Sequence, residues 1–128
     1  MLVEDSETDV FLVNEAIAAH HLDVDLQVVT DGEQAIRVIA RIDADENVPC
    51  PQLFLLDLNI PRTSGFEVLA RLRGSQRCAL VPVIVMTSSN AESDRSESGA
   101  LGATAYFPKP SGYEAFLRIG EVIQSLLA

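Results

Sequence analysis

Four short apolar runs in the 128-residue sequence are followed by polar side chains that could bind a metal ion or a phosphoryl group. The most informative run occupies residues 53–56 and stops at Asp57. Such a run is typical of a buried strand that delivers one acidic side chain to the carboxyl edge of a sheet, where open α/β sheets bind ligands. The polar side chains that follow the four runs are Glu4 and Asp5, Asp57, Thr87 and Lys109.

These residue types, gathered in one pocket, would support phosphoryl chemistry. Three carboxylates repel one another, and Mg²⁺ would relieve the repulsion because it prefers oxygen ligands and retains several waters. Asp57 could then act as a nucleophile that forms an acyl phosphate, while the metal neutralises the phosphoryl charge. Thr87 could donate a hydrogen bond to a phosphoryl oxygen, and Lys109 could pair with another as a point charge.

Alternating strand and helix patterns must position these side chains. Continuous apolar runs predict strands, and apolar residues at helical spacing predict helices. Residues 43–52 predict an exposed acidic loop, and residues 88–98, with five serines, favour a marginal helix. The predicted strands are 1–3, 26–30, 53–57, 82–87 and 103–107, and the predicted helices are 9–20 (capped by Thr8 or Asp9), 33–42, 65–73 and 113–127.

This alternation predicts an α/β fold in a single domain spanning residues 1–128. Parallel strands need helical crossovers of one hand, so we expect a doubly wound, five-stranded parallel sheet with helices on both faces. A flavodoxin-like strand order, 2-1-3-4-5, would bring the four sets of polar side chains together at one edge.

The composition narrows the classes of function. Hydrophobic residues make up 48% of the chain, enough for a core, but no apolar run approaches the roughly 20 residues of a membrane span. A net charge of −10 argues against direct binding to nucleic acid. Acids arrive at Glu4 with no basic segment before them, so we expect a cytoplasmic protein with no secretory signal and no membrane association.

The two cysteines and the two histidines carry no recognisable motif. Cys50 and Cys78 are isolated and form no CxxC pair, so we expect reduced thiols without a function. His20 and His21 end a predicted helix, and we expect them to be solvated there.

Together, these motifs resemble the receiver domains of two-component response regulators over essentially the whole chain. Each piece is weak alone, but four pieces in this order, each at a strand end, are highly specific. The resemblance implies a phosphoacceptor in a phosphorelay, with self-phosphorylation and dephosphorylation chemistry only, and not an enzyme. The matching pieces are Leu2-Val3-Glu4-Asp5, Leu55-Leu56-Asp57-Leu58-Asn59-Ile60-Pro61 with Gly65, Met86-Thr87-Ser88-Ser89 and Lys109-Pro110.

The resemblance also implies a role for each site residue. Asp57 matches the phosphoacceptor, and Thr87 and Lys109 match the pair that grips the phosphoryl group. Tyr106 matches the aromatic switch that turns inward after Thr87, and the peptide bond before Pro110 is expected to be cis. The implied Mg²⁺ ligands are Asp5, Asp57 and the carbonyl of Asn59, with Glu4 reaching the metal through water.

Finer similarities point to a subfamily. The sequence Val-Glu-Asp-Ser-Glu-Thr-Asp, the long loop 43–52 and the sequence at 106–111 look like the stand-alone regulators related to those partnered with bacterial phytochromes. Two features depart from the family pattern. The first strand is short, and Pro108 cannot donate a ladder hydrogen bond.

The implied partners are a sensor histidine kinase, of phytochrome type on the subfamily match, and a downstream protein or phosphotransfer partner. The face formed by the fourth helix, fifth strand and fifth helix would change shape on phosphorylation. A homodimer through the C-terminal elements is a further expectation, with Tyr113, Phe116 and Leu117 forming an exposed patch.

Three alternatives stay open on the sequence. The chain could be a receiver cut from a longer hybrid kinase or transcription regulator. It could be a magnesium-dependent phosphatase of the haloacid-dehalogenase kind, although that class needs an Asp where this chain has Asn59. A nucleotide- or flavin-binding domain is a third alternative, but the glycine-rich phosphate loops of such domains are missing.

Overall fold

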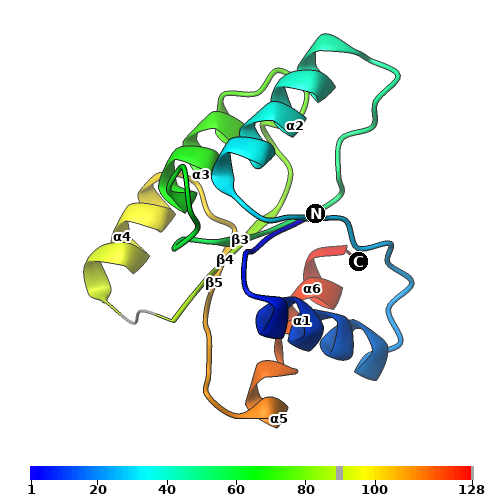
Figure 1. Cartoon of the computed structure of the whole chain (residues 1–128), viewed down its shortest axis with the longest axis vertical. Coiled ribbons are helices and arrows are strands. Elements are labelled where there is room, and N and C mark those ends of the chain that lie inside the picture. Colours follow the sequence, from blue (N-terminus) through cyan, green and yellow to red (C-terminus); the bar gives the residue numbers. More distant parts are fainter. Residues whose placement is uncertain (89–90, 128) are drawn as a thin grey trace.

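The computed structural model describes residues 1–88 and 91–127, which form one parallel sheet with helices on both sides (Figure 1). The strand order is β2-β1-β3-β4-β5, as predicted. The strands are β1 (Leu2–Val3), β2 (Val28–Val29), β3 (Phe54–Asp57), β4 (Val83–Thr87) and β5 (Ala105–Pro108), and the helices are α1 (Glu7–Ala19), α2 (Gly32–Ala44), α3 (Gly65–Arg73), α4 (Glu92–Ala100), α5 (Tyr113–Phe116) and α6 (Ile119–Leu127).

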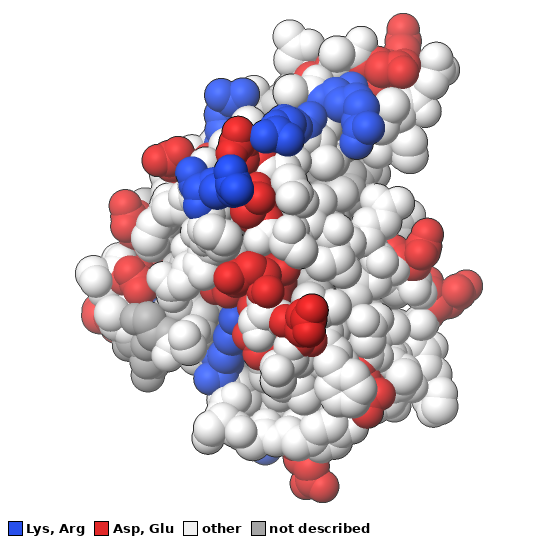
Figure 2. Space-filling view, viewed as in Figure 1, with Lys and Arg blue, Asp and Glu red and all other residues white. Residues whose placement is uncertain are grey.

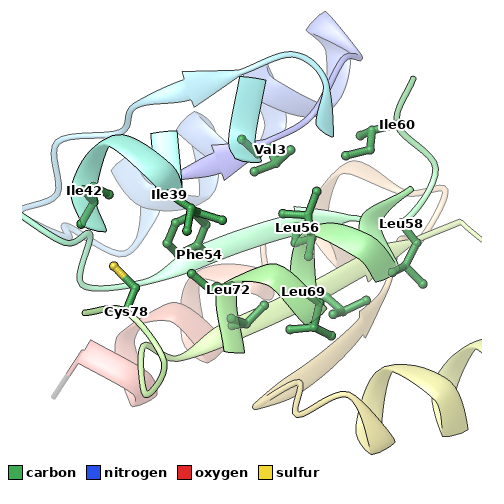
Figure 3. Packing of buried hydrophobic residues seen from close by; sticks show 14 residues of the cluster. Val3, Ile39, Ile42, Phe54, Leu56, Leu58, Ile60, Leu69, Leu72 and Cys78 are labelled. Carbon is green, nitrogen blue, oxygen red and sulfur yellow. The ribbon is translucent and has the colours of Figure 1, made fainter. Parts of the chain in front are cut away.

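The two faces of the sheet contribute side chains to two hydrophobic cores. Successive side chains of a strand point to opposite faces, so Leu55 packs with residues of α1 and α6, and Leu56 with residues of α2 and α3. Figure 3 shows the second core, where Ile39, Phe54 and Leu69 lie between the sheet and the two helices. Each fully buried side chain of this size stabilises the fold by roughly 1.5–3 kcal/mol. The cores therefore give the strand ends a rigid base.

Polar side chains fix where the first three helices begin. The Oγ of Ser6 accepts the Asp9 N–H at 3.3 Å and caps α1. Asp31 caps α2 and Ser64 caps α3 in the same way. The prediction of Thr8 or Asp9 as the first cap was wrong, because the chain becomes helical earlier, directly after Glu4 and Asp5. This early start leaves the Asp9 carboxylate within the first turn of α1.

The C-terminal helix is divided, contrary to the prediction of one helix over 113–127. A tight turn separates α5 from α6, in which the Gly120 N–H bonds the carbonyl of Leu117 only three residues back. Gly120 also lies against the His20 imidazole, where a Cβ would collide with the ring. His20 is therefore packed against α6, and only His21 is exposed as predicted.

Helix α4 forms where the sequence favoured only a marginal helix. It has nine residues, and Ser98 is the buried one among them. Ala91 supplies no side-chain cap at its start. Ser89 and Asn90, which belong to the predicted segment, lie outside the described residues. The helix is thus held by few packing contacts.

Cys50 and Cys78 form a disulfide, so the prediction of isolated, reduced thiols was wrong. Their Cα atoms lie 6.0 Å apart, although 28 positions separate them in the sequence. Cys50 lies in the loop before β3 and Cys78 in the connection before β4, and parallel strands place both at the amino edge of the sheet. Arg77 fastens the same loop, because its guanidinium donates to the carbonyls of Ile42 at 2.6 Å and Val48 at 2.7 Å.

No helix in the described part of the chain is long and apolar enough to cross a membrane.

Pro108 ends β5, an edge strand, where a missing N–H costs no ladder hydrogen bond.

Candidate metal and phosphoryl site

The carboxyl edge of the sheet gathers the side chains predicted to form the site. Register pairs Val3 with Leu56, Asp57 with Met86 and Thr87 with Pro108, so the residues that end these strands lie at one level. Figure 2 shows acidic side chains near the centre of one face with a basic side chain beside them.

Lys109 lies at the centre of this cluster. Its ammonium donates to Asp9 Oδ2 at 2.7 Å, to Asp57 Oδ2 at 3.0 Å and to Glu4 Oε1 and Oε2 at 3.2 and 3.3 Å. The lysine side chain is only 9% exposed. An ammonium carries three N–H donors, so these three carboxylates take its whole donor capacity with charge-assisted hydrogen bonds.

Asp57 is buried and held at both of its oxygens. Oδ1 accepts the backbone N–H of Asn59 at 3.0 Å, and Oδ2 accepts from Lys109. Directly after Asp57, the Leu58 N–H is bonded to the Met86 carbonyl of β4 at 3.1 Å. The carboxylate is therefore fixed at the end of β3 by one hydrogen bond from the chain directly after it and one from Lys109, which follows β5.

Burial and the interaction between Glu4 and Asp57 shift the pKa values of these two carboxyl groups in opposite directions. Burial, then hydrogen bonding to Asp57 and repulsion from it, raises the pKa of Glu4 to about 9. Burial acts to raise the pKa of Asp57 too, but hydrogen bonds to Glu4 and from the Asn59 N–H, together with Lys109, bring it below its ordinary value. Burial opposes the charge of Lys109, but Asp9 and Asp57 outweigh it and raise the pKa of the lysine. At neutral pH the site holds a neutral Glu4, an ionised Asp57 and a charged Lys109.

The carboxylates of Glu4, Asp5 and Asp57 fit a hard divalent cation. One oxygen from each lies within 4.8 Å of the others. Glu4 and Asp57 are buried, whereas Asp5 is exposed and leaves one side open to water. Oxygen ligands with room for several waters are the donor set that Mg²⁺ prefers. Asn59 is exposed, and its backbone N–H is hydrogen-bonded to Asp57.

Thr87 and Tyr106 lie on neighbouring strands beside the site. Thr87 is the last residue of β4 and is fully buried, and its carbonyl accepts the Lys109 N–H at 2.7 Å. Tyr106 on β5 is half-buried, with its ring centre 5.1 Å from the guanidinium carbon of Arg95 on α4. Tyr106 thus links the strand that leads to Lys109 with the lightly packed helix α4.

Two glycines allow close approaches around the Asp57 loop. A Cβ on Gly65 would lie 2.6 Å from the carbonyl oxygen of Asp57 and from the Cα of Leu58. A Cβ on Gly32 would collide with the backbone of Thr63. The close packing of Gly65 makes it part of the frame that positions Asp57.

The peptide bond between Lys109 and Pro110 is trans, so the expectation of a cis bond was wrong. The trans form is favoured for X–Pro bonds by roughly 0.5–1 kcal/mol, and Lys109 reaches its three carboxylates with the bond in that form. The sequence reasoning also missed Asp9, which it treated only as a helix cap. Its position in the turn that directly follows Glu4 and Asp5 was the available signal.

This fold and site define a class of protein, and the comparison with known families gives the same class. The chain belongs to the response regulator receiver domain family, whose model matches residues 1–119. Its members are phosphoacceptors of two-component signalling rather than enzymes of the phosphatase kind, so that alternative is withdrawn.

Comparison with individual proteins identifies more specific similarities. The response regulator Rcp1 of Synechocystis sp. is 34% identical over 125 residues, covering 98% of this chain and 85% of that protein. The Mn²⁺-bound structure of Rcp1 superposes with a TM-score of 0.84 at 35% identity, covering 97% of this chain and 89% of the other. The phosphorylated cyanobacterial phytochrome response regulator RcpA superposes with a TM-score of 0.87 at 31% identity, covering 98% and 90%.

Proposed function

We propose that the chain is a single receiver domain in which Asp57 accepts a phosphoryl group from a sensor histidine kinase. The observation that carries this proposal is the Lys109 ammonium 3.0 Å from a buried Asp57, beside two further carboxylates. One sheet edge would thus supply the nucleophile, the cation and the metal ligands.

Asp5, Asp57 and the Asn59 carbonyl would hold Mg²⁺, with Glu4 reaching it through water. When bound, the metal neutralises charge on the phosphoryl oxygens during transfer. The low pKa of Asp57 keeps its carboxylate ionised for this role at neutral pH.

The transfer itself needs one bond formed and one broken. An oxygen of Asp57 attacks the phosphorus of the donor, the bond from phosphorus to the donor breaks, and the donor leaves with the electron pair. The product is an acyl phosphate. The Lys109 ammonium pairs with one phosphoryl oxygen, and the Thr87 hydroxyl donates a hydrogen bond to another.

We propose that the signal leaves through Thr87, Tyr106 and the face of α4, β5 and the C-terminal helices. The light packing of α4 supports this direction, because an element with few buried contacts shifts at low cost. Phe116 is 1% exposed and cannot belong to a docking patch, so Tyr113, half exposed, is the aromatic that remains there. A downstream protein, a phosphotransfer partner or a second copy could use this face.

The partner kinase is proposed to be of phytochrome type and the location to be cytoplasmic. The support is the similarity to RcpA and to the bacteriophytochrome response regulator RtBRR, which is 34% identical with a TM-score of 0.79 and of which this chain covers 75%.

The test is intact mass after incubation with acetyl phosphate, with and without Mg²⁺. We expect one phosphoryl adduct that needs the metal and disappears in Asp57→Asn. Glu67→Gln, on the exposed side of α3, is the control for general loss of charge and should be modified like the wild type. An adduct that persists in Asp57→Asn would refute the assignment of the acceptor.

A further inference from the structure

Asp9 makes a contact that the proposed function does not use. Its Oδ2 lies 2.7 Å from Lys109 Nζ, the shortest of the four contacts of that ammonium. Asp9 is not one of the three carboxylates whose oxygens converge within 4.8 Å. It therefore lies on the lysine side of the site rather than on the metal side.

We propose that Asp9 is a positioning residue that holds Lys109 before phosphoryl transfer and then competes with the bound phosphoryl group for the same ammonium. This inference rests on the proposed function, because it concerns the same site.

The number of donors on Lys109 creates the competition. Three N–H groups serve three carboxylates, so a phosphoryl group on Asp57 gains a hydrogen bond only if one carboxylate gives one up. When Mg²⁺ and a phosphoryl group are bound, Glu4 and Asp57 would interact with the metal. Asp9 is then the remaining protein partner of the ammonium, and its negative charge also repels the incoming anion.

Asp9 is suited to release the lysine. Its side chain is 21% exposed, compared with 1% for Glu4 and 6% for Asp57, so its carboxylate can turn into water. The residue lies in the first turn of α1, where the helix dipole favours a negative charge whether or not Lys109 is near. Release therefore leaves no buried, unpaired carboxylate behind.

The experiment measures the binding of beryllofluoride, a phosphoryl mimic, in saturating Mg²⁺ by amide NMR shifts. We expect Asp9→Asn to bind it about tenfold more tightly, the effect of removing one competing charge-assisted hydrogen bond. The affinity for Mg²⁺ alone should change less than twofold. Glu7→Gln removes the same charge from the same helical turn, where Glu7 is exposed, and should leave both affinities unchanged.

Each outcome decides the question. Equal or weaker binding by folded Asp9→Asn overturns the role of Asp9, as does an equal gain in Glu7→Gln. Asp9→Glu, which keeps the charge, should restore the wild-type affinity. In the wild type, the carboxyl carbon resonance of Asp9 should shift when beryllofluoride binds, and an unchanged resonance overturns the proposal without any mutation. A wild type that binds no beryllofluoride overturns the proposed function as well.

Discussion

Binding of Mg²⁺ is expected to release a proton from Glu4. Without metal, the pKa of this buried glutamate is about 9, against an ordinary value of 4.5. At pH 7 the group is therefore about 99% protonated, from two pKa units of difference. A cation close to the site favours the ionised carboxylate and returns its pKa toward the ordinary range. Asp57 is already ionised and Lys109 stays charged, so neither contributes a proton.

The expected stoichiometry is about one proton per metal ion at pH 7, and the apparent affinity for Mg²⁺ should rise close to tenfold per pH unit between about 5 and 9. Isothermal titration calorimetry in buffers of different ionisation enthalpy measures the number of protons directly. Glu4→Gln should still bind Mg²⁺ but release no proton. A heat of binding that is independent of the buffer in the wild type would refute the reasoning about Glu4.

Glu4 also links pH to stability in the metal-free protein. Its folded pKa lies above its unfolded pKa, so the folded state binds the extra proton between the two values. The stability contributed by this proton is fully present below about pH 4.5 and is lost as the pH rises through about 9. Urea denaturation with a chelator should follow this fall, and Mg²⁺ should reduce it.

Four further variants test the packing. Replacing Cys50 and Cys78 by serine should lower the free energy of unfolding by roughly 3 kcal/mol, and reducing agent on the wild type should act alike; no change in urea midpoint would contradict the disulfide. Gly65→Ala should destabilise the fold by about 2 kcal/mol and slow phosphorylation, because the added Cβ meets the Asp57 backbone. Its control, Gly99→Ala, places a Cβ in open space on α4 and should stabilise the fold by about 0.5–1 kcal/mol. Equal effects of the two variants would contradict the close approach of Gly65 to Asp57. Phe116→Ala should cost about 3–5 kcal/mol in thermal or urea unfolding, and a cost below about 1 kcal/mol would show that this ring is not in the core.

Much of the fold could be predicted because local and global signals agree. The bounds of α3 over residues 65–73 match the structure, since a serine cap, an apolar stripe and a following glycine all mark them. The end of β3 at Asp57 is also as predicted, because a buried strand must stop where a charge begins. The alternation of strands and helices predicted a parallel sheet, and the flavodoxin-like order expected for it is the one observed.

Other features depend on contacts between distant segments, which spacing does not reveal. The division between α5 and α6 depends on Gly120 meeting His20, about a hundred positions earlier in the chain. The disulfide depends on two loops meeting at the amino edge of the sheet. The role of Asp9 depends on where α1 begins, and an error of two or three residues in the cap concealed it.

The two edges of the sheet are fastened by different kinds of force. At the carboxyl edge, Lys109 and its carboxylates hold together by charge, which a phosphoryl group alters directly. At the amino edge, a covalent sulfur bridge and the carbonyl contacts of Arg77 contain nothing that phosphorylation changes. The amino edge should therefore act as a rigid pivot, and the carboxyl edge should be the part that moves. Activation should tilt the helices and strands about the amino edge, with displacements that grow toward Asp57, rather than expand the whole domain.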